Sequence, residues 1–383
     1  MASIVHILTK LELGGAQQTA LALAAHQAAA GHRVAFVAGI EGALVPALRQ
    51  MRGVEAVLLP ELIHPISLWS DRVCVLRLAA DLRARRPDIV HTHSSKAGIL
   101  GREAARRAGV RGVVHTAYGW SFHQFQNPVA GALFRFLERR AARTTSRLVA
   151  VSDAVRNQGI EAAVGRPDQY TTILNAVDLG RFLSIRPARG TVPIREKLGL
   201  PDGAPIVAMI GNFKKQKAPE DFVAVAARVA GRAQGAHFVF VGDGVRRSEI
   251  EERAASSGFA DRIHFVGWRG DVDEILAETS VVLQTSLWEG LPMSVLQAMA
   301  AARPVVATEV DGTKEAVSDG TTGFLCPPRD IAKLSDRVLS LLEDVGLARQ
   351  MGEAGRARVR AMPGTDLGGM FAAYDAVYAG VAA

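Results

Sequence analysis

The chain has few cysteines: only Cys74 and Cys326, far apart among 383 residues. This scarcity excludes a disulfide framework, and the spacing does not match a zinc site, so both are expected to be buried thiols. No apolar run reaches about 18 residues, the length that a membrane-spanning helix needs. The apolar start at residues 3–8 is short and lacks a basic flank, unlike a secretory signal peptide. We therefore expect a cytoplasmic protein.

Several ligand-binding signatures are also missing. Gly14 and Gly15 lack a third glycine and an acidic residue placed for a ribose, which argues against a nicotinamide dinucleotide site. The lysine-rich loop at residues 211–217 lacks the Gly-Lys-Ser/Thr sequence of a nucleoside-triphosphate P-loop. No recognised nucleic-acid motif is present, so nucleic acid is not an expected partner.

The net charge of +7 comes from the first half of the chain. Residues 1–185 contain 22 Lys and Arg against 13 Asp and Glu, whereas the remainder contains 23 against 25. In the densest segment, residues 133–147, Arg135, Arg139 and Arg143 recur every four residues among Phe and Leu side chains. This spacing predicts a basic amphipathic helix at about residues 135–147. Such a helix either has a solvated face or binds an anionic membrane, where each Lys or Arg gains about 1 kcal/mol.

The length exceeds that at which one core usually stops growing, so two domains are expected. Short β-branched runs alternate with Ala-, Leu- and Arg-rich helical stretches, which predicts α/β domains with parallel sheets. The pattern restarts at residues 206–210. We expect two tandem doubly wound, Rossmann-like domains facing a central cleft. The expected ranges are 1–182, a linker at 183–204, 205–365, and a last helix at about 366–383 that packs back on the first domain.

Ligands in doubly wound sheets bind beyond the carboxyl ends of strands, so loops that follow strands are candidate sites. Gly14 and Gly15 precede a helix and let its backbone N–H groups approach an anion. Lys214, Lys215 and Lys217 favour a polyanionic ligand. A tight turn or a solvated lysine cluster is the alternative. Further loops of this kind, where a nucleobase or its phosphates could bind, contain Gly242, Trp268 and Arg269.

The stretch from Glu289 to Gln297 joins a carboxylate to a helix start. Pro292 is expected at the first helical position, so the N–H groups of residues 293–295 should point out as an anion site. A carboxylate beside a phosphate is electrostatically unfavourable, so Glu289 is expected to accept hydrogen bonds from the hydroxyls of a neutral sugar. Gln297 lies about 7 Å from the helix start, near the distance from a diphosphate to its ribose.

These segments resemble the family-four retaining glycosyltransferases of the GT-B fold, which build polysaccharides, glycolipids and sucrose. The likeness covers nearly the whole chain and is carried by GDGVRRSEIE, FVGW, SLWEGLPMSVLQAMAAARPVVAT and DGTTGFLCPP. Two further segments, HTHSSKAG and HTAYGWSFHQF, resemble acceptor-side segments of polysaccharide-building members. The resemblance implies a nucleotide-sugar donor and retention at the anomeric carbon. Because Lys217, its lysine neighbours and the helix start at Pro292 would stabilise charge on the leaving diphosphate, no metal or other cofactor is expected.

Position by position, the resemblance assigns Glu289 to donor-sugar hydroxyls, Gln297 to the ribose and Lys217 to the diphosphate. The predicted catalytic residues are Glu289, Lys217 and His123. Together, the loop positions and the resemblance predict these substrate-binding residues: Gly14, Gly15, Tyr118, Gly211, Asn212, Lys214, Lys215, Gly242, Trp268, Arg269, Gly290, Leu291, Pro292, Met293, Ser294 and Gln297.

Three positions depart from the family pattern. Gln297 replaces a glutamate, Asn212 replaces the phosphate-binding arginine, and Tyr118 replaces the histidine of a His-Gly pair. A neighbouring lysine can supply the lost charge, but as a point charge and not a bidentate fork. Tyrosine is not a base near neutral pH, so His123, five residues later, is the predicted stand-in.

The sequence thus predicts a hexosyltransferase of polysaccharide or glycolipid biosynthesis, with a saccharide or lipid-linked saccharide acceptor and peripheral contact with the inner face of an anionic membrane. Alternatives are a sugar-nucleotide epimerase of the same architecture and a non-catalytic sugar-nucleotide-binding protein. His91 and His93 point to one side of a strand, but no third ligand is near in sequence, so no metal site is expected.

Overall fold

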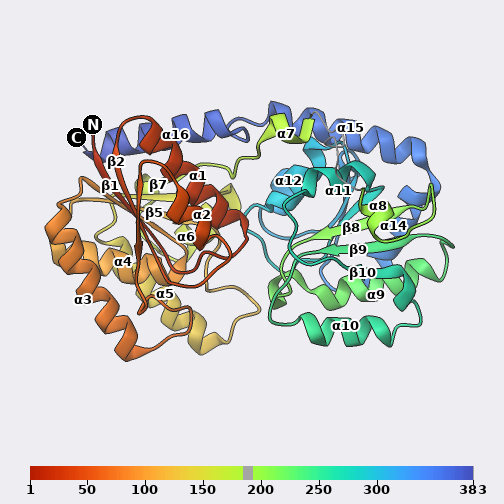
Figure 1. Cartoon of the computed structure of the whole chain (residues 1–383), viewed down its shortest axis with the longest axis horizontal. Helices are drawn as coiled ribbons and strands as arrows, with labels where there is room; N and C mark the ends of the chain where they lie inside the picture. Colours follow the sequence, from red (N-terminus) through yellow and green to blue (C-terminus); the bar gives the residue numbers. More distant parts are fainter. Residues whose placement is uncertain (184–192, 383) are drawn as a thin grey trace. The chain divides into compact units, whose positions relative to one another are not determined.

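The computed structural model describes residues 1–183 and 193–382, which form two compact α/β units (Figure 1). Unit 1 comprises Met1–Asn175 and the last helix from Gly368, and unit 2 comprises Ala176–Leu367. The first boundary lies at Asn175 and not at residue 182, because residues 176–182 belong to unit 2, where Val177 pairs with Asp366. The fold class predicted from the sequence, with two doubly wound parallel sheets, is confirmed.

The sheet of unit 1 has the order β3-β2-β1-β4-β5-β6-β7, and all its neighbouring strands are parallel. The strand order reverses between β1 and β4, where ligands of doubly wound sheets bind. The strands are β1 (Ser3–Leu8), β2 (Arg33–Ala38), β3 (Val54–Leu58), β4 (Ile89–His93), β5 (Gly112–Ala117), β6 (Arg147–Ala150) and β7 (Tyr170–Thr172).

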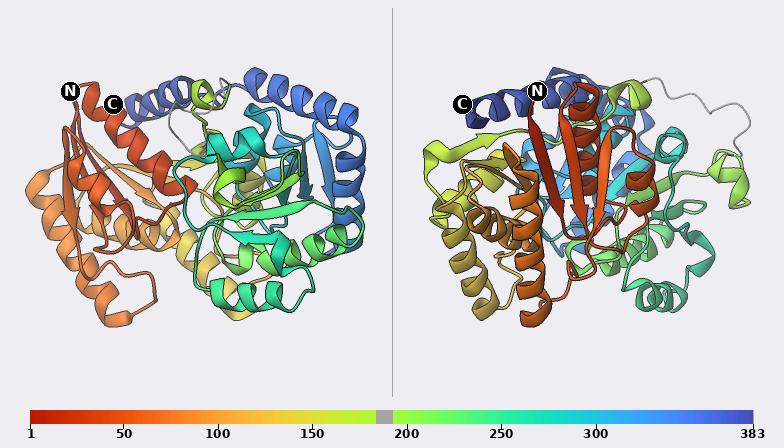
Figure 2. Two further views of the ribbon diagram at one scale, coloured as in Figure 1. Left: turned by 45° about the vertical axis from the view of Figure 1, so that its right-hand side comes forward. Right: turned by 60° about the vertical axis from the view of Figure 1, so that its left-hand side comes forward.

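Helices cover both faces of this sheet. On one face α1 and α2 pack over apolar side chains such as Phe36, and on the other α3 and α4 pack over side chains such as Ile7 and Val90. Figure 2 shows α16 next to α1, and Asp375 Oδ2 of α16 lies 2.9 Å from His26 Nε2 of α1. The helices are α1 (Gly15–Ala29), α2 (Val45–Gln50), α3 (Leu68–Arg85), α4 (Ser95–Ala108), α5 (Pro128–Ala142), α6 (Asp153–Glu161) and α16 (Leu367–Ala382).

The sheet of unit 2 has the order β10-β9-β8-β11-β12-β13, with the reversal between β8 and β11. Its strands are β8 (Ile206–Ile210), β9 (His237–Val241), β10 (Ile263–Phe265), β11 (Val281–Gln284), β12 (Val305–Thr308) and β13 (Gly323–Cys326). Its helices are α7 (Leu179–Leu183), α8 (Ile194–Lys197), α9 (Pro219–Ala230), α10 (Arg247–Ala255), α11 (Val272–Glu278), α12 (Met293–Ala300), α13 (Thr313–Ala316), α14 (Ile331–Glu343) and α15 (Val345–Ala361).

Residues 184–192 of the expected linker lie outside the described residues. The following part of this expected linker, residues 193–204, is packed against unit 2, because Ile194 and Leu200 are buried in an apolar cluster there. Both cysteines are buried free thiols, as expected. In the described part of the chain, none of the helices combines the length and apolar character needed to cross a bilayer.

Candidate active site

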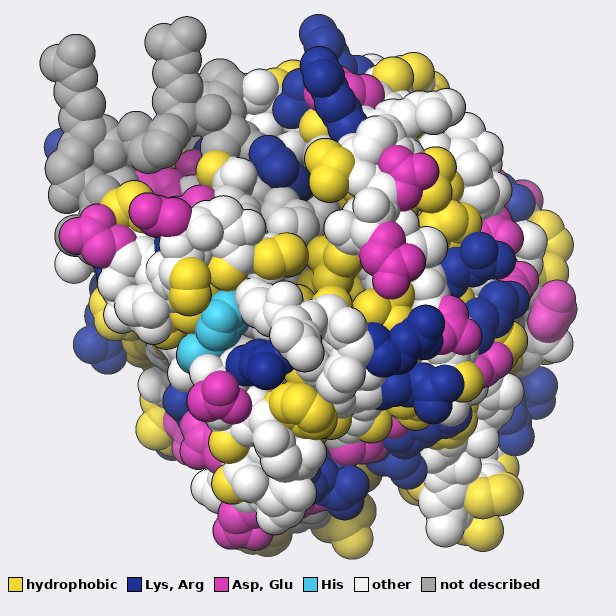
Figure 3. All heavy atoms as spheres, turned by 90° about the vertical axis from the view of Figure 1, so that its right-hand side faces the viewer, with side chains coloured by type: hydrophobic (Ala, Val, Ile, Leu, Met, Phe, Trp, Pro, Cys, Tyr) yellow, Lys and Arg dark blue, Asp and Glu magenta, His cyan; other side chains and the backbone are white. Residues whose placement is uncertain are grey.

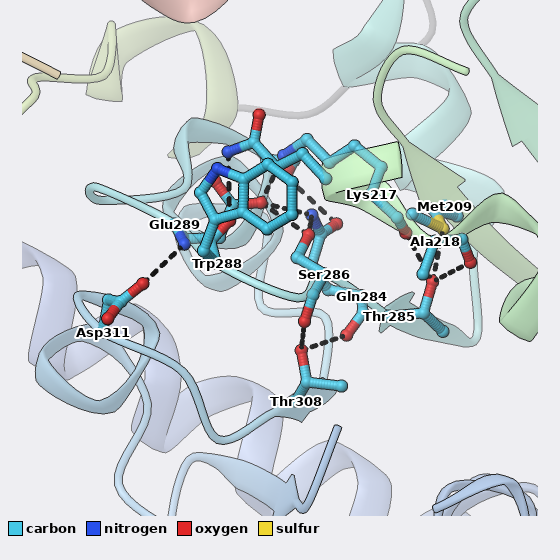
Figure 4. A network of polar contacts seen from close by, with 12 residues as sticks. Met209, Lys217, Ala218, Gln284, Thr285, Ser286, Trp288, Glu289, Thr308 and Asp311 are labelled. Carbon is cyan, nitrogen blue, oxygen red and sulfur yellow. Dashed lines mark hydrogen bonds and ion pairs between the residues drawn. The ribbon is translucent and has the colours of Figure 1, made fainter. Parts of the chain in front are cut away.

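The strand reversal of unit 2 brings two loops together beyond the sheet. The loop after β8 carries Lys217, and the loop after the neighbouring strand β11 carries Glu289. Lys217 Nζ donates to Glu289 Oε1 at 2.5 Å, and both side chains are largely buried, with 13% and 6% of their surfaces exposed. Two candidates that are 72 residues apart therefore form one ion pair, shown in Figure 4.

Two further donors converge on the same carboxylate oxygen. Ser286 Oγ donates to Glu289 Oε1 at 2.5 Å, and Gln284 Nε2 donates to it at 3.1 Å. Gln284 Nε2 also approaches Ser286 Oγ at 2.8 Å. Hydrogen bonds to a charged group are stronger than neutral ones, so this arrangement fixes the orientation of Glu289. The three donors all use Oε1, and Oε2 has no hydrogen bond to any described residue.

Backbone contacts hold the two loops to each other. Thr285 Oγ1 donates to the carbonyl oxygen of Lys217 at 2.8 Å, and Leu287 N donates to that of Gln216 at 2.7 Å. Gly312 lies so close to Gly290 that a Cβ at 312 would be 1.8 Å from the Gly290 carbonyl oxygen. Only glycine fits there, which keeps the backbone around Glu289 in place.

The start of α12 differs in detail from the expectation. Pro292 is the residue before the helix and not its first residue. Val295 N donates to the Pro292 carbonyl oxygen at 3.1 Å, so the predicted anion site at residues 293–295 is reduced to the N–H groups of Met293 and Ser294. Ser294 Oγ donates to Gln284 Oε1 at 3.4 Å, which links the helix start to the Glu289 network. Leu291 is buried just before it.

Two positions of unit 2 depart from the family pattern, Gln297 and Asn212, and both lie outside the hydrogen-bond network of Glu289. Gln297 is half-buried, and its side-chain amide has no hydrogen bond to any described residue. Asn212 Oδ1 is buried without a partner. Of the neighbouring lysines, Lys214 is half-buried and Lys215 is exposed. Their roles in donor binding stay predictions.

The glycine loops pack directly against the Lys217 loop. Gly242 has φ +146°, and a Cβ there would lie 1.7 Å from the Gly211 carbonyl oxygen, so only glycine is tolerated. Gly242 N donates to the Gly267 carbonyl oxygen at 2.8 Å, which brings the next loop alongside. In that loop Trp268 is 39% exposed, while Arg269 is held by Asp271 at 2.8 and 2.5 Å.

Three residues of this site were missed at the level of sequence: Gln284, Ser286 and Asp311. Asp311 Oδ2 accepts the backbone N–H of Glu289 at 3.1 Å. The available signal was the end of β11, where polar residues follow the apolar run Val281–Leu283 directly. Polar side chains at the carboxyl end of a buried strand are candidates for a site.

The candidates of unit 1 follow β1 and β5. Gly14 precedes α1, which begins at Gly15 and not at Ala16, so the glycine pair lies at the helix start as expected. Tyr118 comes directly after β5, and His123 lies in the loop before α5. Tyr118 Oη lies 3.3 Å from His93 Nδ1, so this candidate is joined to the histidines of β4.

The strand register supplies a third histidine that the sequence did not suggest. His6 of β1 lies opposite His91 of β4, and ligand atoms of His6, His91 and His93 lie within 4.8 Å of one another. Every ring nitrogen already has a hydrogen-bonding neighbour. The pairs are His6 Nδ1 with His93 Nε2 (3.0 Å), His6 Nε2 with Gln27 Oε1 (2.6 Å), His91 Nδ1 with Tyr378 Oη (2.5 Å), His91 Nε2 with Thr116 Oγ1 (2.8 Å), and His93 Nδ1 with Tyr118 Oη. The donor set alone would suit zinc, but binding would displace these hydrogen bonds.

Hydrogen bonding fixes one direction for the protons in this network. Gln27 Oε1 only accepts, so His6 donates from Nε2 and accepts at Nδ1 from His93 Nε2–H. His93 Nδ1 then accepts from Tyr118. Each of these rings is neutral, and burial lowers the pKa of His6 to about 4 and that of His91 and His93 well below the ordinary value.

We expect the fold to lose stability in mild acid. The pKa of His6 is about 4 in the fold and about 6.5 when unfolded, so the unfolded chain binds more protons between these values. Stability is complete above about pH 6.5 and falls as the pH decreases. For His6 alone the loss from pH 7 to pH 5 is about 2 kcal/mol. Urea unfolding followed by circular dichroism at both pH values measures it, and equal stabilities would show that the buried histidines are not neutral.

Two family models and several known proteins match this chain. The family model described as Glycosyltransferase Family 4 matches residues 13–181, and that described as Glycosyl transferases group 1 matches residues 192–358. The chain is 32% identical to the UDP-Gal:alpha-D-GlcNAc-diphosphoundecaprenol alpha-1,3-galactosyltransferase of Escherichia coli, over 76% of each chain. It is 30% identical to the alpha-maltose-1-phosphate synthase of Mycolicibacterium smegmatis, over 77% of this chain and 81% of the relative.

Among solved structures, HepE of Anabaena in complex with UDP and glucose superposes with a TM-score of 0.85 at 19% identity, covering 99% of this chain and all of that one. At this identity the likeness shows the fold, whereas the two relatives and the family models show the family. The chain therefore belongs to the family-four glycosyltransferases and is a hexosyltransferase of the GT-B fold.

Proposed function

We propose that this enzyme moves a hexosyl unit from a nucleotide-diphosphate sugar to an acceptor hydroxyl. The observation that carries the proposal is the Lys217–Glu289 pair at the strand reversal of unit 2, where doubly wound sheets bind nucleotides. The names of two similar proteins point to the same donor class, since one uses UDP-Gal and the other is complexed with UDP and glucose.

In the proposed complex, Glu289 Oε2 accepts a hydrogen bond from a hydroxyl of the donor sugar. Oε1 already accepts hydrogen bonds from Lys217, Gln284 and Ser286. Lys217 keeps further N–H bonds for the diphosphate, since an ammonium group has three donors. The helix start at Met293 and Ser294 and the neighbouring lysines add positive potential there. Charge that develops on the leaving diphosphate would thus be stabilised without a metal ion.

Retention at the anomeric carbon and the chemical class of the acceptor are proposed from the family resemblance. The galactosyltransferase relative is named for a diphosphoundecaprenol-linked acceptor, which favours a lipid-linked saccharide here. The α5 helix displays Arg135, Arg139 and Arg140 on its outer face. We place the enzyme on the cytoplasmic side, in peripheral contact with an anionic membrane through this helix.

Incubation with radiolabelled UDP-, GDP- and ADP-sugars, with and without a lipid-linked saccharide, tests the proposal. The expected result is label in the acceptor fraction, with an α linkage when the donor is α-linked. Conversion of the donor to an epimer without acceptor would support the epimerase alternative. Donor binding without any turnover would support a binding protein and overturn the proposal.

Gln297 provides a finer test of donor binding. Its amide can accept from one ribose hydroxyl and donate to the other, whereas a carboxylate only accepts. Gln297→Ala should therefore raise the donor KM roughly 10-fold, near 1.4 kcal/mol, with a smaller effect on kcat because the ribose is remote from the reacting carbon. Gln297→Glu should change the donor KM by only a few-fold. If alanine matches wild type in donor kinetics, Gln297 does not contact the ribose.

A further inference from the structure

The turn that enters α3 exposes three large apolar side chains. Ile66, Leu68 and Trp69 have 65%, 89% and 77% of their surfaces exposed to solvent. Single exposed apolar residues are normal, as Val245 and Val345 illustrate in unit 2. Three such residues within four positions form a patch, and exposed apolar patches mark sites of interaction with a partner or a membrane.

This turn is held rigidly. Ser67 Oγ accepts from Ser70 N at 3.4 Å, and Ser67 N donates to Asp71 Oδ2 at 3.2 Å, so the start of α3 is capped in both directions. Lys96 of α4 pairs with Asp71 at 2.6 Å and donates to the Pro65 carbonyl oxygen. Because the turn is already ordered, docking of its apolar side chains would lose little conformational entropy.

The helix α5 also presents an apolar stripe to solvent. Val129, Leu133 and Phe136 follow one face of the helix and are 79%, 51% and 60% exposed. The opposite face buries Glu138, which pairs with the fully buried Arg102 of α4. A surface helix normally buries its apolar face and exposes its charges. The outer face of α5 departs from this pattern, because three large apolar side chains are exposed there beside the arginines, and this indicates an apolar partner.

Arginines surround the α5 stripe without acidic partners. Arg135, Arg139, Arg140 and Arg143 are exposed, and none of them forms an ion pair within residues 1–183 and 193–382. Over the face drawn in Figure 3, in contrast, basic and acidic side chains lie next to one another. Since α3 and α5 both pack against α4, the turn and the stripe belong to one helix layer. An anionic, partly apolar surface complements this combination.

We propose that the α3 turn and the outer face of α5 form one docking surface for a bilayer of anionic lipids. Leu68, Trp69 and Phe136 enter the interfacial region, where aromatic side chains are favoured, while the arginines stay at the headgroup phosphates. The inference extends the proposed membrane contact and rests on it. It adds an apolar anchor in α3, so that attachment does not depend on charge alone.

Sedimentation with vesicles of phosphatidylcholine and phosphatidylglycerol, using the full chain, tests the anchor. The double variant Leu68→Ser with Trp69→Ser should bind at least about tenfold more weakly at both low and high salt. Arg135→Glu with Arg140→Glu should weaken binding mainly at low salt, because screening already reduces its contribution at high salt. The matched control, Val245→Ser with Val345→Ser, removes exposed apolar side chains from unit 2 and should bind as wild type does.

Brominated phospholipid gives a second measurement that does not depend on affinity. It should quench part of the tryptophan fluorescence of the wild type, and Trp69→Phe should abolish that part. Unchanged vesicle binding by the double serine variant would overturn the proposal, as would self-association that the same variant abolishes, since a second copy would then be the partner. Thermal shifts with UDP-, GDP- and ADP-sugars test the donor site independently of the vesicles.

Discussion

Glu289→Gln is expected to lower kcat/KM about 300-fold, near 3.4 kcal/mol. The amide oxygen can replace Oε1 as the acceptor for Lys217, Ser286 and Gln284. Its NH₂ group then occupies the position of Oε2 and presents a donor where the donor-sugar hydroxyl needs an acceptor. The substitution also leaves Lys217 without its counter-charge in a largely buried pair.

Steady-state kinetics with the natural donor measure the effect, and circular dichroism confirms that the variant is folded. Ser286→Ala is the matched comparison, because it removes one of the three donors and leaves the carboxylate in place. The kcat/KM of Ser286→Ala should be about tenfold lower than that of wild type, a loss near 1.4 kcal/mol. If the kcat/KM of Glu289→Gln stays within about threefold of wild type, the carboxylate does not contact the donor sugar.

The sequence predicts which loops contain the donor-site candidates. It does not predict that the loops after β8 and β11 contact each other. The sequence predicts Lys217 in a loop that follows a strand, and Glu289 just before the start of a helix. That β8 and β11 are neighbours depends on the strand order of the sheet, in which β9 and β10 lie on the other side of β8. The ion pair between the two side chains is a consequence of this topology.

Short or strongly polar features were less accessible to prediction. β7 has three residues, and β13 begins at Gly323, so neither shows a long β-branched run. Gln284 and Ser286 act on Glu289 only because the loop after β11 turns back on the strand end. His6 reaches His93 through the pairing of β1 with β4, across 87 residues of sequence.

The basic helix shows a different limit. Its existence and charge followed from the arginine spacing, yet the structure ends α5 at Ala142, with Arg143 as its cap and Arg147 at the start of β6. The apolar residues exposed on it are Val129, Leu133 and Phe136. Their orientation is set by the burial of Glu138 against Arg102, an interaction between two helices that helical periodicity alone does not reveal.

Lys217→Ala is expected to lower kcat/KM roughly 100-fold, about 2.7 kcal/mol. The variant removes the ammonium group that we propose binds the diphosphate, and it also removes one of the three donors that orient Glu289. A loss mainly in kcat would mean that the charge acts on the leaving diphosphate in the transition state, whereas a loss mainly through donor KM would mean ground-state binding.

Lys215→Ala is the matched control, since Lys215 lies in the same loop but is exposed, and no described residue pairs with its side chain. If general positive potential were sufficient, both variants would lose activity to a similar extent, and they would respond alike to salt. If a specific contact is needed, Lys215→Ala should stay within about threefold of wild type while Lys217→Ala shows the full loss. Wild-type turnover by Lys217→Ala would remove Lys217 from the diphosphate site and leave its pairing with Glu289 as a structural contact.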